Sequence, residues 1–130
     1  MSDIKIKPTG LSEELKEQDI LVEEYEGKNY YYIKDMFSNV YFGKNNCCDF
    51  GFFTEYSEER DSMYVFGGIS FLGFNGNRDD QIIVCESEYL YDNSNIDDLK
   101  AKYKQIVQEC NKAYENWVRE FIANFTDPQD

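Results

Sequence analysis

The sequence predicts an α+β fold: a four- to five-stranded antiparallel sheet covered on one face by a long C-terminal helix, with a short N-terminal helix. Residues 20–92 alternate runs of aromatic and β-branched side chains with turn signals, which is typical of antiparallel strands. Residues 95–125 instead carry apolar side chains at spacings of three and four, the period of an amphipathic helix. Because 130 residues is the size of one domain, we expect both regions to share a single core.

The N-terminal segment is expected to contribute little to that core. Residues 1–10 are polar and end in Pro-Thr-Gly, so they are predicted to form a flexible arm. A short helix over Leu11–Gln18 is expected to follow, with Thr9 or Ser12 as its N-cap. Two glutamates in its first turn suit the positive end of the helix dipole.

Five segments are expected to form strands, and Asn39–Gly43 is a short sixth candidate. The five are Ile20–Tyr25, Tyr30–Lys34, Phe50–Tyr56, Met63–Phe74 and Gln81–Tyr91. Gly27 supplies the permissive backbone that the first hairpin turn needs, and Asn75-Gly76 is the strongest hairpin signal in the chain. The pair Gly67-Gly68, inside one strand, predicts a bulge or a sharp bend.

The C-terminal segment is predicted to be one long helix. Asn95 is a good N-cap, and Asp97 and Asp98 suit the first turn. About 30 residues would span roughly 45 Å, which exceeds the expected length of the sheet. We therefore expect the helix to bend, to overhang, or to use part of its stripe as a homodimer face. The stripe consists of Ile96, Leu99, Tyr103, Ile106, Val107, Cys110, Ala113, Tyr114, Trp117, Val118, Phe121 and Phe125.

A single helix leaves the second face of the sheet uncovered, and this region is too aromatic for that face to be wholly polar. Tyrosine suits such a face, because its ring is apolar and its hydroxyl is polar. The tyrosines expected there are Tyr30, Tyr32, Tyr56, Tyr64, Tyr89 and Tyr91.

The composition argues against an enzyme. The chain has no histidine, which removes the commonest general base and the commonest metal ligand. It has 26 acidic residues against 13 basic ones, a net charge of −13. The many like-charged side chains repel one another in the compact state, and we expect a positively charged partner to compensate for this repulsion. We therefore expect an acidic binding protein that needs no metal and no cofactor.

The four cysteines indicate a reducing compartment. Cys47, Cys48, Cys85 and Cys110 contain no CxxC pair, so their spacing suits neither a zinc site nor a redox motif. They are expected to be buried free thiols, with a Cys85–Cys110 disulfide as the alternative. Without an apolar signal core or a run of 18 apolar residues, the chain is predicted to be cytoplasmic, in the host cell if phage-encoded.

The negative charge is concentrated in the predicted sheet. Residues 61–94 carry six acidic residues against one basic residue, Arg78. Glu86 and Glu88 are two apart on a strand, which places both carboxylates on one face, about 6.6 Å apart, and Glu24 and Glu26 repeat this spacing. The candidate partner-binding residues are Glu24, Glu26, Glu58, Glu59, Asp79, Asp80, Glu86 and Glu88 as phosphate-like groups, with Tyr89 and Tyr91 as anchors.

These observations predict a non-catalytic inhibitor that docks on the basic groove of a nucleic-acid-processing enzyme, such as a nuclease. By analogy of class, small phage anti-defence proteins of the anti-CRISPR or anti-restriction type have this acidic character. The main alternative is an immunity protein that neutralises a basic nuclease toxin. A small-ligand binder and a self-assembling subunit also remain open. Direct binding to nucleic acid is not expected, because a single-strand groove needs positive charge.

Overall fold

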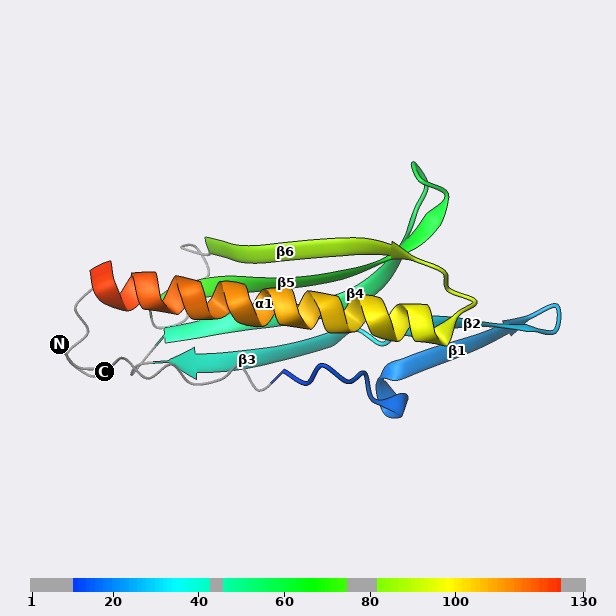
Figure 1. Ribbon diagram of the computed structural model, residues 1–130, viewed down its shortest axis with the longest axis horizontal. Coiled ribbons are helices and arrows are strands. Elements are labelled where there is room, and N and C mark those ends of the chain that lie inside the picture. Colours follow the sequence, from blue (N-terminus) through cyan, green and yellow to red (C-terminus); the bar gives the residue numbers. More distant parts are fainter. Residues whose placement is uncertain (1–10, 43–45, 75–81, 125–130) are drawn as a thin grey trace.

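The computed structural model describes residues 11–42, 46–74 and 82–124, with side chains described for 11–39, 48–71 and 82–120. It confirms the predicted α+β architecture (Figure 1). A four-stranded antiparallel sheet has the order β3-β4-β5-β6, and one face of it packs against the helix α1. The elements are β3 (Met36–Phe42), β4 (Asn46–Ser57), β5 (Ser62–Phe74), β6 (Ile82–Tyr91) and α1 (Ile96–Asn124).

A separate two-stranded hairpin, formed by β1 (Ile20–Tyr25) and β2 (Lys28–Ile33), extends from one end of this sheet (Figure 1). Its two-residue turn has positive φ at both positions, 50° at Glu26 and 77° at Gly27, as a type I′ turn requires. The N–H of Ile33 donates to the Thr54 hydroxyl at 3.2 Å. This bond fixes the base of the hairpin to β4.

The short N-terminal helix is a 3₁₀ turn, η1 (Glu17–Asp19), rather than a helix over Leu11–Gln18. The Ser12 hydroxyl does accept a hydrogen bond from the N–H of Glu14, at 3.1 Å. The helix does not continue, because Leu15 is drawn into the core and the backbone at Lys16 is extended. The predicted arm, residues 1–10, lies outside the described residues.

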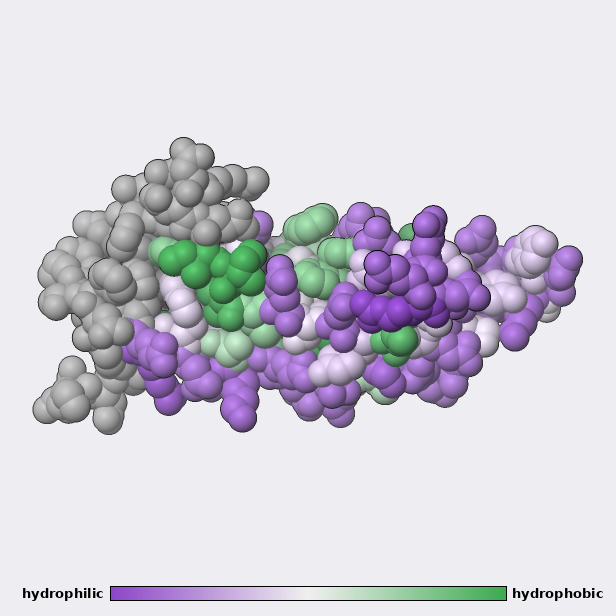
Figure 2. Space-filling model, turned by 90° about the horizontal axis from the view of Figure 1, so that it is seen from above, coloured by the Kyte–Doolittle hydropathy of each residue, from purple (hydrophilic) through white to green (hydrophobic). Residues whose placement is uncertain are grey.

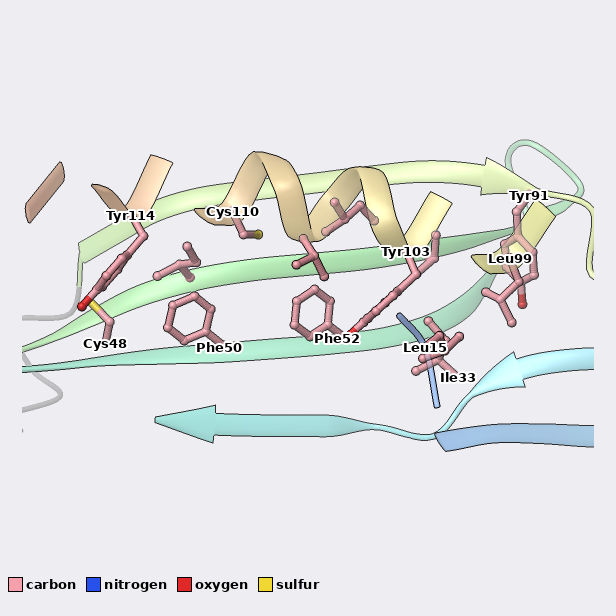
Figure 3. Close-up of a cluster of buried hydrophobic side chains, with 14 of the residues drawn as sticks. Leu15, Ile33, Cys48, Phe50, Phe52, Tyr91, Leu99, Tyr103, Cys110 and Tyr114 are labelled. Atoms are coloured by element: carbon pink, nitrogen blue, oxygen red, sulfur yellow. The ribbon is translucent and has the colours of Figure 1, made fainter. Parts of the chain in front are cut away.

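The core lies between α1 and the long strands β4 and β5 (Figure 3). Phe50 of β4 packs against Tyr114 of the helix, with ring centroids 5.8 Å apart, and Phe52 packs against Tyr103 at 5.3 Å. The helix lies close to the sheet at Gly67, where a Cβ atom would lie 2.3 Å from Cγ2 of Ile106. Glycine at this position therefore sets how near the helix lies to the sheet.

The expectation that the helix overhangs the sheet is confirmed at its C-terminal end, where α1 continues past the described strands (Figure 1). The 29 residues of α1 span about 43 Å. The 13 residues of β5 span about the same length, but β4 and β5 curve away from α1 towards the turn that joins them (Figure 1). From Leu99 to Val118 the stripe residues are buried except Ala113 and Trp117, which are half-buried. The side chains of Phe121 and Phe125 lie outside those described. No helix in the described ranges is long and apolar enough to cross a membrane.

The irregularity expected at Gly67-Gly68 occurs just beyond these residues. Both glycines pair in regular register with β6, opposite Ser87 and Glu86. The register shifts between Ile69 and Ser70, where β6 contains one extra residue. The predicted Asn75-Gly76 turn lies outside the described residues.

Candidate functional site

The candidate site begins with the face of the four-stranded sheet that points away from α1, called here the open face. Successive strand residues alternate between the two faces. In β5, Val65, Gly67 and Ile69 are buried towards the helix, so their neighbours point to the open face. By this alternation and the strand register, the open face consists of Phe37, Asn39, Asp49, Gly51, Phe53, Glu55, Tyr64, Phe66, Gly68, Ser70, Glu86, Glu88 and Leu90.

The open face has an aromatic centre. The rings of Phe53 and Phe66 stack across β4 and β5, with centroids 4.9 Å apart and an interplanar angle of 26°. Phe37, on the edge strand β3, is 73% exposed. Its ring lies over Gly51, where a Cβ atom would be 3.2 Å from Cε1 of Phe37. Phe53 and Phe66 are half-buried, so the open face presents one exposed ring beside two partly exposed ones, the kind of side chain that anchors protein contacts.

Carboxylates border this aromatic centre. Glu86 and Glu88 are both exposed on the open face, which confirms the prediction that they share one side of a strand. Arg60, in the turn between β4 and β5, donates to Glu88 at 2.9 Å. This hydrogen bond raises the pKa of the Arg60 guanidinium. It also joins the turn that carries Glu58 and Glu59 to the strand that carries Glu88.

All four glutamates are exposed: Glu86 and Glu88 lie on β6, and Glu58 and Glu59 lie in the turn that Arg60 joins to Glu88. Figure 2 shows a hydrophilic cluster where the β4–β5 turn projects, and a hydrophobic area over the start of β6. The exposed residues in that part of β6 are Ile82 and Ile83, at 49% and 55%. The surface thus combines clustered charge with exposed apolar side chains.

A tyrosine holds a further carboxylate on the open face. The Tyr64 hydroxyl donates to Oε2 of Glu55 at 2.8 Å. The pKa of Tyr64 is raised, first by this hydrogen bond and then by burial. The Tyr56 hydroxyl similarly donates to Asp61 in the adjoining turn. Both tyrosines thus retain their protons, and each fixes a negative charge in place.

Two predicted anchors lie on the wrong face. Tyr91 is 6% exposed, and its hydroxyl donates to the backbone oxygen of Tyr31 at 2.8 Å. Tyr89 is half-buried on the helix side, where its hydroxyl donates to Glu109 of α1. The expectation that both lie on the uncovered face is therefore wrong, because the alternation of β6 turns its odd-numbered residues towards the helix.

The predicted acidic residues are only partly brought together. Glu24 and Glu26 do not repeat the strand spacing, because β1 ends at Tyr25 and Glu26 lies in the turn with positive φ. Their hairpin is separate from the sheet that carries Glu86. Asp79 and Asp80 lie outside the described residues.

Sequence reasoning missed Phe37, Phe53 and Phe66 as surface residues. β4 carries phenylalanine at positions 50, 52 and 53, so aromatic side chains point to both faces. Alternation therefore does not reveal which ring is exposed. The two glycines that face each other, Gly51 and Gly68, were a usable signal, since paired glycines leave a gap in a sheet surface.

Two wide, open depressions lie on the helix side of the sheet. One of about 440 Å³ lies between the N-terminal segment and β3, with Met36, Phe52 and Tyr103 in its wall. Another, of about 510 Å³, lies between the segment around Leu15 and the first turns of α1. In the part of the chain that the structure describes, no group of three or more cysteine or acidic side chains is placed to hold a metal ion.

Cys48 and Cys110 are buried, Cys85 is half-buried, and none of the three is in a disulfide bond. The side chain of Cys47 lies outside those described. Burial, with Cys85 nearby, raises the pKa of the Cys110 thiol to about 12. The sheet and the helix thus bring together the two cysteines of the alternative disulfide, in reduced form.

Comparison with known proteins finds no protein-family model, curated protein or solved structure that matches this chain. Its function is therefore inferred from the chemistry of its surface.

Proposed function

We propose that this chain is a non-catalytic binding protein whose open face docks on the basic groove of a nucleic-acid-processing enzyme and excludes nucleic acid. One observation carries the proposal. The exposed carboxylates of Glu86 and Glu88 lie on the same sheet face as the stacked rings of Phe53 and Phe66 and the exposed ring of Phe37, and Arg60 joins the turn carrying Glu58 and Glu59 to Glu88.

The physical argument rests on what such a groove presents. Proteins that bind nucleic acid place lysine and arginine against its phosphates. Carboxylates two residues apart on a strand, about 6.6 Å from each other, offer a comparable row of negative charges. The net charge of −13 attracts a basic partner over a longer range. The exposed ring of Phe37, with the half-buried rings of Phe53 and Phe66, supplies the apolar contact that anchors a protein interface.

The Arg60–Glu88 ion pair does not remove this negative surface. Its side chains are 45% and 42% exposed, so water screens the pair and it contributes little to stability. Arg60 also lies over the ring of Tyr64, 5.9 Å from its centroid. A basic partner could displace Arg60 from Glu88 at small cost.

The test is capture of partners from a bacterial lysate by the tagged protein, with elution by a salt gradient or by added duplex DNA or RNA. We expect a basic nucleic-acid-binding protein that is released by moderate salt and by competing nucleic acid. The variant Glu59→Gln/Glu86→Gln should capture at most about one tenth as much of this partner protein as the wild type does. The matched control, Glu115→Gln/Glu120→Gln, removes the same charge from exposed positions on α1 and should retain as much as the wild type.

Three outcomes would contradict the proposal. The captured protein could remain bound both at high salt and in excess nucleic acid. The two double variants could lose binding equally, which would show that only net charge matters. The protein could also retain no nucleic-acid-binding protein at all.

A further inference from the structure

A small slot crosses the open face between Phe37 and Glu86. These two residues lie at the ends of one row of cross-strand neighbours, Phe37, Gly51, Gly68 and Glu86. The two middle positions are glycines, so no Cβ atom rises from the floor of the slot. The rings of Phe37 and Phe66 lie beside this floor, 3.2 Å and 3.1 Å from where the Cβ atoms of Gly51 and Gly68 would be. The depression measures about 170 Å³.

The neighbouring rows form the walls of this slot. On one side are the stacked rings of Phe53 and Phe66. On the other side are Asp49 and Ser70, which are paired across β4 and β5. The slot therefore has an aromatic wall, a polar wall with one carboxylate, and a second carboxylate at its end.

The volume and the lining restrict what the slot would hold. Pockets for cofactors and drug-sized ligands measure about 300–1,000 Å³, so about 170 Å³ suits the end of one side chain. Aromatic faces attract cations, and the carboxylates of Asp49 and Glu86 add negative charge. A guanidinium is planar, stacks on aromatic rings and pairs with carboxylates through several N–H groups.

We propose that the slot between Phe37 and Glu86 receives an arginine side chain of the partner protein. The guanidinium stacks against the phenylalanine rings and donates hydrogen bonds to Glu86 and Asp49. This inference rests on the proposed function in one respect, that the partner is a basic protein. Beyond the proposed function, it names the residue type that the partner presents, arginine, and the place on this protein where that side chain binds.

The test is an NMR titration of the full-length protein with the peptide acetyl-Gly-Arg-Gly-amide, beside the same peptide with lysine or citrulline in place of arginine. The arginine peptide should shift the amide signals of Gly51, Gly68 and Ser70 in a saturable way. It should bind at least about threefold more tightly than the lysine peptide. Only a guanidinium both stacks on aromatic rings and donates two parallel hydrogen bonds to a carboxylate. The citrulline peptide should not saturate, because it carries no charge.

Three variants locate the binding. Phe37→Ala and Glu86→Gln should each weaken it by about three- to fivefold. Gly51→Ala should also weaken it, by narrowing the slot without removing a ring or a charge, since its Cβ meets only the exposed Phe37 ring. The matched control is Glu115→Gln, which removes an equal charge from an exposed position on α1, outside the slot lining, and should change binding by less than twofold.

The outcomes separate this inference from the proposed function. If the arginine peptide leaves the Gly51 and Gly68 signals unmoved while a basic partner is still captured and released by nucleic acid, the slot inference fails alone. Equal binding of the lysine peptide would also overturn it. If the arginine peptide binds at the slot but no nucleic-acid-binding protein is captured, the proposed function fails and the slot stands.

Discussion

At the scale of single residues, Gly67 has the most direct effect on how α1 packs. A Cβ atom at this position would lie 2.3 Å from Ile106 and 2.6 Å from the ring of Phe52, both of which are in the buried core. Neither neighbour is free to move without shifting the helix.

We therefore expect Gly67→Ala to lower the free energy of unfolding by about 1–3 kcal/mol, as overpacking does. The control is Gly51→Ala, whose Cβ would meet only the exposed Phe37 ring at 3.2 Å, and which should change stability by less than about 1 kcal/mol. Urea denaturation followed by circular dichroism measures both. Equal losses in the two variants would show that the packing distance of α1 is not set at Gly67.

The thiol of Cys110 should make stability depend on alkaline pH. Burial raises its pKa from 9.0 to about 12 in the folded protein. Between these values the unfolded chain loses the proton and the folded chain retains it, so the free energy of unfolding falls as the pH rises.

The variant Cys110→Ala lacks this proton. We expect the wild type to lose about 1–2 kcal/mol more than the variant between pH 9 and pH 11, because one proton is worth about 1.4 kcal/mol per pH unit at most. Burial also raises the pKa values of Tyr91 and Tyr103. Because the wild type and the Cys110→Ala variant both contain these tyrosines, they do not contribute to the difference between the two proteins. Denaturation at a series of pH values tests this, and parallel pH profiles would refute it.

At the scale of elements, the start of α1 depends on a cap that the sequence predicted. The side-chain oxygen of Asn95 accepts hydrogen bonds from the N–H groups of Asp97, at 3.0 Å, and Asp98, at 3.3 Å. The Asp98 carboxylate accepts another from the N–H of Asp92 at 2.7 Å, and this bond is the main cause of its lowered pKa. The loop between β6 and α1 is thereby closed onto the first turn of the helix.

Asn95→Ala should cost about 0.5–2 kcal/mol, because two N–H groups of the first turn lose their acceptor. Asn95→Asp keeps an oxygen at the same place and should retain most of the stability. Thermal unfolding of the three proteins gives the comparison. A loss in the aspartate variant as large as that in the alanine variant would show that the side-chain cap does not act as described.

At the scale of the whole molecule, the charge should act oppositely on stability and on binding. Two ion pairs, Arg60–Glu88 and Lys102–Asp98, occur among the described residues, so most of the excess negative charge there lacks a nearby compensating cation. Salt screens the resulting repulsion within the folded protein.

We expect the melting temperature to rise between 10 mM and 300 mM sodium chloride. Over the same range, binding to a basic partner should weaken, because salt also screens that attraction. Differential scanning calorimetry measures the first effect, and the partner-capture experiment measures the second. A melting temperature that falls with salt would mean that the carboxylates do not destabilise the compact state.

Much of the fold was predictable because it depends on local periodicity. The spacing of Leu99, Tyr103, Ile106 and Cys110 defines one helical stripe, and the structure buries all four. The strands were also found close to their predicted positions, although β3 begins earlier and β4 extends further. The N-terminal helix was less predictable, because the burial of Leu15 in the tertiary core overrides the local capping signal.

The candidate site was predictable only in part. The shared face of Glu86 and Glu88 follows from the two-residue period of a strand, which is a local property. That Arg60, in the turn carrying Glu58 and Glu59, reaches Glu88 depends on how the β4–β5 turn folds. The prediction that Tyr89 and Tyr91 lie on the uncovered face was wrong for a similar reason. The two-residue period separates the two faces of a strand, but it does not say which face packs against the helix.

The sequence by itself determined the charge, the long helix and the strand pattern, because composition and periodicity are properties of the chain. Only the tertiary structure decided what each face of the sheet does. Gly67 and Gly68 are adjacent and identical, yet one receives the helix and the other forms part of the floor of the slot. Both faces of β4 and β5 are aromatic, so the choice between them was made by the packing of α1, which buries one face and leaves the other uncovered by the helix.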